Sequence, residues 1–143
     1  MIMEESVAER LKRVAGSKTV RLTHYGRKSG KPYQVTIWFA VDVDRVYLGT
    51  AKVDRQWVRN VQKTHRVVLA IRGEIFDGEA RFLRDRDELD HAQGMIRRKY
   101  WPFLPVMVLA RLLAGIGLVR DTSGFFEVTF FASLSPNRGS GQQ

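Results

Sequence analysis

The stretch YQVTIWFAVDVDRVYLGT, residues 33–50, decides the fold class, because its apolar residues recur at every second position. With a period of two, alternate side chains lie on opposite faces of a β-strand. The DVD segment at 42–44 predicts a tight reversal into a second strand over 45–50. The stretch therefore predicts a β-hairpin. One face of its first strand carries Tyr33, Val35, Ile37, Phe39 and Val41.

Apolar runs on the carboxyl side extend this hairpin into a sheet. The run RVVLAIRG, residues 66–73, is continuous and predicts a central strand. Asp77 and Gly78 predict a turn into a partner strand over EARFLRD, residues 79–85. The run GFFEVTFF, residues 124–131, predicts the last strand. About six strands connected as hairpins, with helices beside them, favour a small β-barrel.

Helical patterns flank and interrupt the strands. Residues 4–15 repeat apolar residues at helical spacing, with Ser6 as the capping residue and Gly16 at the end. Asp54 can cap a second, short helix, and residues 86–101 show a third helical pattern. Together these elements predict an α+β fold that is mainly β. The short helix is predicted to turn Trp57, Val58 and Val61 inward and Arg55, Arg59 and Lys63 outward.

The composition is that of an ordinary globular domain, with 143 residues of which 44% are hydrophobic and 27% charged. We expect a single domain over residues 1–134, followed by a disordered tail over 135–143. The absence of cysteine excludes disulfides and thiolate chemistry. The charged first segment lacks the apolar core of a secretory signal, so we expect a cytoplasmic protein.

The net charge of +9 indicates an anionic partner. Nucleic acid, an anionic membrane surface and a phosphorylated or polycarboxylate small molecule all fit this charge. The apolar segment 101–119 is near the length of a membrane-spanning helix, but Arg111 at its centre would cost about 2.5–3.5 kcal/mol there. We therefore expect a buried or interfacial helix, which leaves a peripheral membrane contact through residues 103–119 as an alternative.

The loop GRKSGK, residues 26–31, carries three cations and a hydroxyl just ahead of the hairpin. Arg27 can hold a carboxylate or phosphate through two hydrogen bonds, and the glycines let a ligand approach the backbone. A second candidate follows the hairpin, where Lys52 precedes the start of a helix. The alternative for each loop is a solvated turn. If the two loops converge, one cationic pocket would contain Arg27, Lys28, Lys31, Lys52, Arg55 and Arg59.

The remaining candidate groups are aromatic rings and histidines. Trp38 can stack on a flat ring, pack against a second copy of the chain or cap a second core. His24, His65 and His91 lack the closely spaced partners of a metal site, so we predict no bound metal. His24 lies beside the basic loop, where it can contact a ligand or belong to a turn. Since no nucleophile elbow or Walker loop is present, an enzyme with this sequence would draw its chemistry from a bound cofactor.

The motif THYGRKSGKP at 23–32, followed by a hairpin, TAK at 50–52 and WVRN at 57–60, resembles the split β-barrel flavin and deazaflavin oxidoreductases. These include the deazaflavin-dependent nitroreductases and, more distantly, the pyridoxamine-phosphate oxidases. The resemblance runs from about residue 19 to residue 84, with weaker agreement to about residue 131. It implies a six-stranded split β-barrel with an N-terminal helix, a short helix after the first hairpin and C-terminal helices. Members of this superfamily are commonly homodimers.

The resemblance also implies roles for residues at matching positions. The phosphate and acidic tail of the cofactor would be faced by Arg27, Lys28, Ser29 and Lys31. The phosphate or ring would be approached by Thr50, Ala51 and Lys52, with support from Trp57, Arg59 and Asn60. Trp38 would flank the ring. Tyr100 and Trp101 would contact the substrate, or else pack in the core, and Tyr100 or a bound water would donate a proton.

Two departures from the family pattern bear on the cofactor. Val53, Asp54 and Arg55 stand where the nitroreductases usually carry glycines, and THRV at 64–67 stands where relatives have NPRV. The first departure lies beside the implied phosphate site. The sequence therefore leaves two candidate cofactors, the 5-deazaflavin coenzyme F420 and FMN.

The function implied by the resemblance is hydride transfer between the ring of F420 and a small hydrophobic, conjugated or nitro-bearing substrate. The oligoglutamate tail of F420 would match the charge of +9. The alternatives are an FMN-binding oxidoreductase of the same superfamily and a non-enzymatic protein that binds a flavin or a tetrapyrrole. Nucleic acid ranks low, because Tyr33, Phe39 and Tyr47 lie at strand positions rather than between exposed cations.

Overall fold

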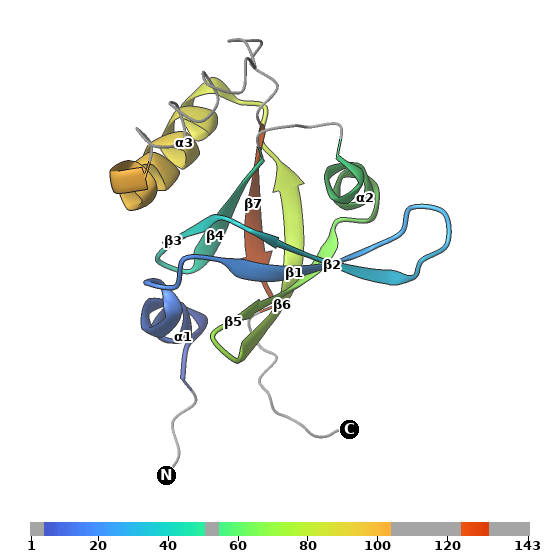
Figure 1. Cartoon of the computed structure of the whole chain (residues 1–143), viewed down its shortest axis with the longest axis horizontal. Coiled ribbons are helices and arrows are strands. Elements are labelled where there is room, and N and C mark those ends of the chain that lie inside the picture. The colour runs from blue at the N-terminus through green and yellow to red at the C-terminus, as the bar shows by residue number, and fades with distance from the viewer. Residues whose placement is uncertain (1–4, 51–54, 104–123, 132–143) are drawn as a thin grey trace.

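Seven strands form one antiparallel sheet in the computed structural model of the chain, which describes residues 5–50, 55–103 and 124–131 (Figure 1). Across the sheet their order is β2-β1-β5-β6-β7-β4-β3. Their bounds are β1 (Val20–Tyr25), β2 (Pro32–Ile37), β3 (Phe39–Asp42), β4 (Arg45–Thr50), β5 (Arg66–Ile71), β6 (Glu74–Phe82) and β7 (Gly124–Phe130).

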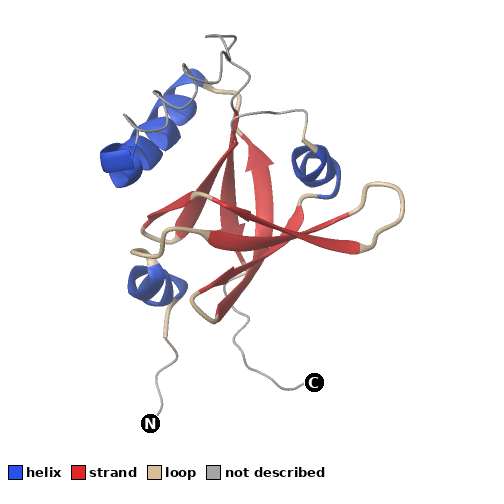
Figure 2. Cartoon of the chain, viewed as in Figure 1, coloured by secondary structure: helices blue, strands red, loops and turns tan. Residues whose placement is uncertain are grey.

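The two edge strands, β2 and β3, follow one another in the sequence with only Trp38 between them. Because β2 pairs with β1 at one edge and β3 pairs with β4 at the other, the two edges come together at Trp38. The sheet therefore curls into a split barrel (Figure 2). This confirms the predicted fold class. The predicted count of six strands is wrong, because the alternating stretch 33–41 divides at Trp38 into two strands with different partners.

The turn between β5 and β6 also differs from the prediction. It lies at Arg72 and Gly73, whose φ angles of 51° and 85° are typical of a two-residue hairpin turn. The predicted turn at Asp77 and Gly78 is wrong, because both residues lie inside β6. A Cβ atom at position 78 would collide with the carbonyl oxygen of Thr129. This glycine therefore permits the close approach of β7 rather than a reversal of the chain.

In the described part of the chain, three α-helices accompany the sheet, and they confirm the helical segments predicted at 4–15, after Asp54 and at 86–101. The helix predicted over 101–119 lies almost entirely outside the described residues. In the first helix, the Ser6 hydroxyl accepts a hydrogen bond from the Glu9 amide and the Glu9 carboxylate accepts one from the Ser6 amide. This reciprocal pair is a capping box. Asp85 caps the third helix through the amides of Asp87 and Glu88. The helices are α1 (Val7–Val14), α2 (Gln56–Thr64) and α3 (Arg86–Tyr100), and a 3-10 turn, η1 (Trp101–Phe103), follows α3.

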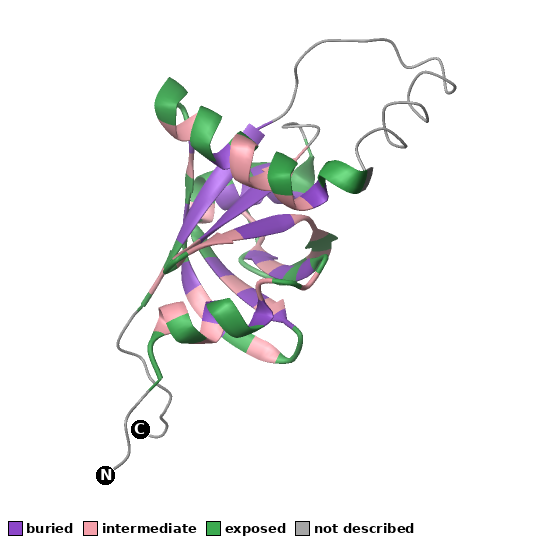
Figure 3. Ribbon diagram, turned by 90° about the vertical axis from the view of Figure 1, so that its left-hand side faces the viewer, coloured by how far each residue is buried: buried purple, intermediate pink, exposed green. Residues whose placement is uncertain are grey.

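The first two helices bury their apolar faces in the core of the barrel (Figure 3). The predicted inward and outward faces of α2 are confirmed, since Arg55, Arg59 and Lys63 are exposed. α3 packs instead beside β3, β4 and β7, where Ala92 joins a smaller apolar cluster with Tyr47 and Leu83. The residues that α1 and α2 add to the barrel core are Leu11, Val14, Trp57, Val58 and Val61.

Among the described residues, no helix is both long enough and apolar enough to cross a membrane. Most of the apolar segment 103–119 and the whole predicted tail 135–143 lie outside the described residues. The peripheral membrane contact, the disordered tail, the single domain over 1–134 and the cytoplasmic location therefore stay predictions.

Candidate functional site

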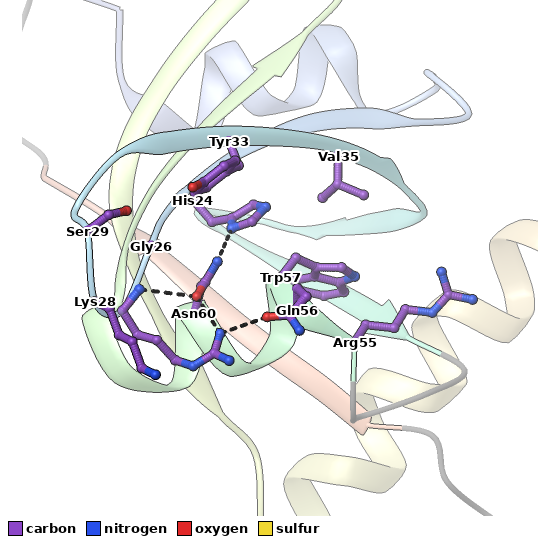
Figure 4. Close-up of a pocket in the computed structure, with 11 residues that line it drawn as sticks. His24, Gly26, Lys28, Ser29, Tyr33, Val35, Arg55, Gln56, Trp57 and Asn60 are labelled. Carbon is purple, nitrogen blue, oxygen red and sulfur yellow. Dashed lines mark hydrogen bonds between the residues drawn. The ribbon is translucent and has the colours of Figure 1, made fainter.

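A cavity of about 680 Å³ opens between the β1–β2 loop and the start of α2 (Figure 4). β1 and the loop contribute His24, Gly26, Arg27, Lys28 and Ser29 to its wall. β2 contributes Tyr33 and Val35, and the α2 region contributes Arg55, Gln56, Trp57 and Asn60. The cavity thus joins two segments that are about thirty residues apart in the sequence.

The loop that forms one rim of the cavity is held by its own backbone. The Gly26 amide donates to the Lys31 carbonyl oxygen, and the Gly30 amide donates to the Gly26 carbonyl oxygen, each at 2.9 Å. Gly30 has a φ of 72°, a left-handed conformation that glycine adopts without strain. The Lys31 amide donates to the Ser29 hydroxyl oxygen at 3.2 Å. This closed turn leaves Lys28 and Ser29 exposed at the rim.

Arg27 connects the loop to α2. Its main-chain amide and its Nη1 both donate to Asn60 Oδ1, at 3.2 and 2.8 Å, and Nη1 also donates to Gln56 Oε1 at 3.0 Å. The structure records no partner among the described residues for Arg27 Nε and Nη2. Because the guanidinium is already oriented, its remaining donors can bind an anion with little further loss of rotamer freedom.

Asn60 extends this connection to His24. The Asn60 Oδ1 accepts from Arg27, so the other end of the amide is the NH₂ group, and it lies 3.1 Å from His24 Nδ1 (Figure 4). An NH₂ group can only donate, so His24 Nδ1 accepts and carries no proton. The neutral ring is therefore the tautomer protonated at Nε2. Burial lowers the pKa of His24 below its usual value of 6.5, which is consistent with a neutral ring.

The interior of the cavity is apolar. Trp57 is only 5% exposed and packs against Phe126 in the barrel core, with ring centroids 5.6 Å apart. Tyr33 is 47% exposed and its ring stacks on His24, with centroids 5.8 Å apart. Val35 lies on the same strand face as Tyr33. A flat ring can therefore be sandwiched or flanked here by rigid aromatic surfaces.

The start of α2 adds a cation and backbone amides that no described side chain caps. Arg55 is the residue before the helix, it makes no side-chain capping hydrogen bond, and the first turn contains no acidic residue. Such a helix start favours an anion nearby. The predicted cap, Asp54, lies outside the described residues, as do Ala51 and Lys52.

Four of the residues predicted to bind the cofactor lie away from the wall of this cavity. Lys31 and Arg59 are exposed, and neither lines the cavity. Thr50 ends β4 and pairs with Gly124 of β7, also outside the cavity wall. Trp38 stacks on Tyr100, with ring centroids 4.0 Å apart and planes 6° apart.

Tyr100 lies with Trp38 and Lys99 in a second group that we call the Trp38–Tyr100 cluster. The Tyr100 side chain is 2% exposed, and its hydroxyl donates to the Lys18 carbonyl oxygen at 2.6 Å. The same hydroxyl accepts from the Phe39 amide at 3.2 Å. Burial raises the pKa of Tyr100, and the following residue, Trp101, is 63% exposed. Neither of these two predicted substrate contacts lines the cavity.

Lys99 completes the Trp38–Tyr100 cluster. Its Nζ donates to the Phe39 carbonyl oxygen at 3.0 Å and lies 3.5 Å from the centre of the Phe39 ring. Burial lowers its pKa to about 8. The ammonium is thus held by the backbone and by an aromatic face within the chain.

Six wall residues were not among the cofactor-binding residues that the resemblance implies, namely His24, Gly26, Tyr33, Val35, Arg55 and Gln56. The alternating pattern placed Tyr33 and Val35 on a core face, but β2 is an edge strand and leaves them partly open. The sequence indicates a site residue more strongly at His24 than at Tyr33 or Val35. His24 follows Val20 and Leu22 at the inward positions of β1, and it directly precedes the basic loop.

The wall residues fit a cofactor that joins a flat ring to an acidic chain. Cations lie at the exposed rim, while Trp57 and Val35 supply an apolar interior and His24 an uncharged donor. A phosphate or carboxylate matches the rim, and an uncharged ring matches the interior.

Solved structures share the fold at low sequence identity. A protein assigned as a pyridoxamine 5'-phosphate oxidase from Listeria innocua has a TM-score of 0.61 at 11% identity, covering 90% of this chain and 94% of that one. An F420-H2 dependent reductase has a TM-score of 0.56 at 20% identity, covering 78% and 93%. A domain-swapped dimer has a TM-score of 0.58 at 21% identity, covering 78% and 79%. A search of the curated protein sequences found no match.

The family assignment comes from the sequence itself. The profile of the F420H(2)-dependent quinone reductases matches residues 1–103, which include every described residue of the cavity wall. This match confirms the predicted relationship to the deazaflavin oxidoreductases, and it favours F420 over FMN as the cofactor. The chain belongs to the F420H(2)-dependent quinone reductase family and is an oxidoreductase of the coenzyme F420.

Proposed function

We propose that this oxidoreductase reduces a small hydrophobic, conjugated acceptor, foremost a quinone, with the coenzyme held in the cavity between the 26–31 loop and α2. A nitro-bearing aromatic is the second class of acceptor that we propose. The observation that supports this most directly is the division of one cavity into a cationic rim and an apolar interior. That division matches the two chemically different ends of F420, an acidic tail and a flat ring.

The residues that would hold the coenzyme follow from this division. Arg27, Lys28 and Arg55 would bind its phosphate and glutamate groups, and the Ser29 hydroxyl would donate a further hydrogen bond. Trp57 and Val35 would lie against the ring. Lys31, Thr50, Ala51, Lys52, Arg59 and Trp38 stay proposals from the resemblance alone.

When bound, the reduced coenzyme supplies a hydride, and this hydride together with one proton converts a quinone to a hydroquinone. The chain's own residues position and shield that exchange. Arg27 is fixed across the loop and α2 before any ligand arrives, and Trp57 excludes water from the interior. Because the Tyr100 hydroxyl is bonded to Lys18 and Phe39, we propose water as the proton source.

The cofactor can be tested through tryptophan fluorescence. The chain has three tryptophans, so the variant Trp38→Phe/Trp101→Phe keeps Trp57 as its only one, and quenching then reports on the cavity. We expect oxidised F420 to quench Trp57 at lower concentration than FMN does. Preferential binding of FMN, or binding of neither, would contradict the proposal.

The acceptor can be tested with pre-reduced F420 and excess menadione, following the return of the visible absorbance of the oxidised coenzyme. A nitroaromatic compound in place of menadione tests the second class. We expect turnover with menadione. Binding of F420 without turnover of either acceptor would overturn the proposed substrate class and leave the cofactor site standing.

A homodimer stays part of the proposal. It rests on the resemblance to a superfamily whose members are commonly dimers, and a structural neighbour forms a domain-swapped dimer. Light scattering on the purified protein tests it, and a monomer at micromolar concentration would contradict it.

A further inference from the structure

His24 is the most deeply buried polar side chain in the cavity wall, together with Asn60. Both are 5% exposed. His24 occupies the inward position of β1 after Val20 and Leu22, so its ring belongs to the interior face of the barrel rather than to the solvated loop. A buried imidazole is normally hydrogen-bonded at both ring nitrogens or serves a function.

Only one of the two ring nitrogens of His24 has a partner within the described residues. Nδ1 accepts from Asn60, and Nε2 carries the proton. The structure records no hydrogen bond from Nε2 among those residues. Figure 4 shows the ring edge that faces away from Asn60 turned toward Val35 and Trp57, across the apolar part of the cavity.

The charge on each part of the wall limits what Nε2–H can bind. A phosphate or carboxylate is best held by the half-buried Arg27 and the exposed Lys28, where water and full positive charges compensate its own charge. A neutral N–H donor inside an apolar pocket matches an uncharged acceptor. The pyrimidine part of a deazaflavin ring offers such acceptors, its carbonyl oxygens.

We propose that His24 is a specificity-determining residue whose Nε2–H donates a hydrogen bond to a ring carbonyl oxygen of the deazaflavin, with Asn60 as the positioning residue that fixes the donating tautomer. This inference rests on the proposed function, because it assumes that the ring enters the cavity. Arg27 holds Asn60, so the cationic rim and the ring contact are parts of one hydrogen-bonded chain.

Two substitutions at position 24 separate its two bonds. The Asn side chain of His24→Asn places its amide near the position of Nδ1, so it can keep a bond to Asn60 but presents nothing at the position of Nε2. The longer side chain of His24→Gln reaches the position of Nε2 and restores a donor there. The two variants differ by one methylene, and thermal unfolding checks that both fold.

Two probes separate a ring contact from a phosphate contact. One is oxidised F420, and the other is FO, which has the same ring and ribityl chain without the phosphate and glutamates. We expect His24→Asn to raise the Kd of both probes about tenfold, as for the loss of one buried hydrogen bond. His24→Gln should raise the Kd less. Nitrogen-15 NMR of the wild-type histidines should show Nε2 protonated, with its proton moving downfield when FO binds.

The outcomes are distinguishable. If wild-type protein binds F420 and FO, and His24→Asn binds both as well as wild type, the inference is overturned while the proposed function stands. If His24→Asn weakens the binding of F420 but not that of FO, the contact of His24 is with the phosphate, and the inference is also overturned. Failure of the wild type to bind F420 would overturn the proposed function and the inference together. A histidine protonated at Nδ1 would contradict the role of Asn60.

Discussion

Two regions of the molecule place aromatic rings beside cations, and they differ in whether their polar groups already have partners. In the Trp38–Tyr100 cluster, the Tyr100 hydroxyl and the Lys99 ammonium both bond to main-chain groups of the same chain. In the cavity, His24 Nε2 and two of the three Arg27 guanidinium nitrogens have no partner among the described residues. A cluster whose polar groups all have hydrogen-bond partners stabilises the fold, whereas a cluster with open donors can bind a ligand.

The comparison explains why residue type alone is a poor guide to the site. Tyr100 and Trp38 are the kinds of residue that contact a flat ring, yet their rings are stacked on each other at 4.0 Å. In the sequence, His24 indicates a ring contact less specifically than Tyr100 and Trp38 do. Its Nε2–H is nevertheless a donor that has no partner among the described residues. Substitutions in the two regions should therefore affect different measurements, binding in one and stability in the other.

Arg27→Ala should give the largest loss of binding. It removes the oriented guanidinium and also leaves Asn60 Oδ1 without its side-chain donor. Since a charge-assisted hydrogen bond contributes about 1.5–3 kcal/mol, we expect the Kd for F420 to rise roughly 10- to 100-fold. Fluorescence titration measures this. Lys63→Ala is the matched control, because Lys63 is exposed in the last turn of α2 and does not line the cavity.

The control makes the result specific. Both substitutions remove one positive charge, so general attraction of an acidic ligand to a protein of net charge +9 would weaken binding similarly in each. Equal effects of the two variants would mean that the loop and α2 do not form the anion site.

Tyr100→Phe should affect stability and leave binding unchanged. It removes the hydroxyl that bridges the Lys18 carbonyl oxygen and the Phe39 amide, but it keeps the ring stacked on Trp38. We expect the free energy of unfolding to fall by about 1–2 kcal/mol, measured by urea denaturation. The Kd for F420 should stay within about twofold of the wild type, since the wall of the cavity is untouched. A large loss of menadione turnover with normal stability would restore Tyr100 as a proton donor.

The local elements of the fold and the basic loop of the cavity could be predicted from local sequence patterns. Period two and period 3.6 are properties of neighbouring residues, so the hairpin at 39–50 and the inward face of α2 were visible in the sequence. The cationic loop was visible for the same reason. Ser6 as the cap of α1 was visible too, because a cap and the amide that it accepts from lie within one turn of chain.

The errors have a common physical cause, which is pairing between distant strands. The local sequence predicts a turn at Gly78, but a glycine is needed there because β7, about fifty residues later, lies against it. The division of β2 from β3 at Trp38 reflects the closure of the whole sheet. The Arg27–Asn60–His24 connection likewise joins residues 33 and 36 positions apart, which no local pattern reports.

Stability should also depend on pH through His24. Burial lowers its pKa below 6.5 in the folded protein, so between pH 6.5 and that lower value the unfolded chain binds more protons than the folded one. The free energy of unfolding should therefore decrease as the pH falls through this range and be unaffected by His24 above it. Thermal unfolding of the wild type and of His24→Asn between about pH 7.5 and pH 5 measures this.

The variant should show the shallower decline over that range, because it lacks the buried imidazole of His24. The carboxylates do not obscure the comparison. Arg13 and Arg10 lower the pKa of Glu74, and Arg81 lowers that of Glu88, so their contributions are lost below pH 4.5. Parallel curves for the two proteins would show that His24 is not held neutral in the folded state.

Trp101→Ala should have the smallest effect, and it tests where the acceptor enters. Trp101 is 63% exposed and follows the Trp38–Tyr100 cluster directly, outside the wall of the cavity. If it contacts the acceptor as the resemblance implies, its loss should raise the KM for menadione by about two- to threefold, as for a residue at a solvent-exposed rim, and leave the Kd for F420 unchanged. A tenfold or larger rise would mean that the acceptor is enclosed by this side chain when it binds, and that the second region belongs to the active site after all. An unchanged KM would confine the chemistry to the cavity side of the barrel.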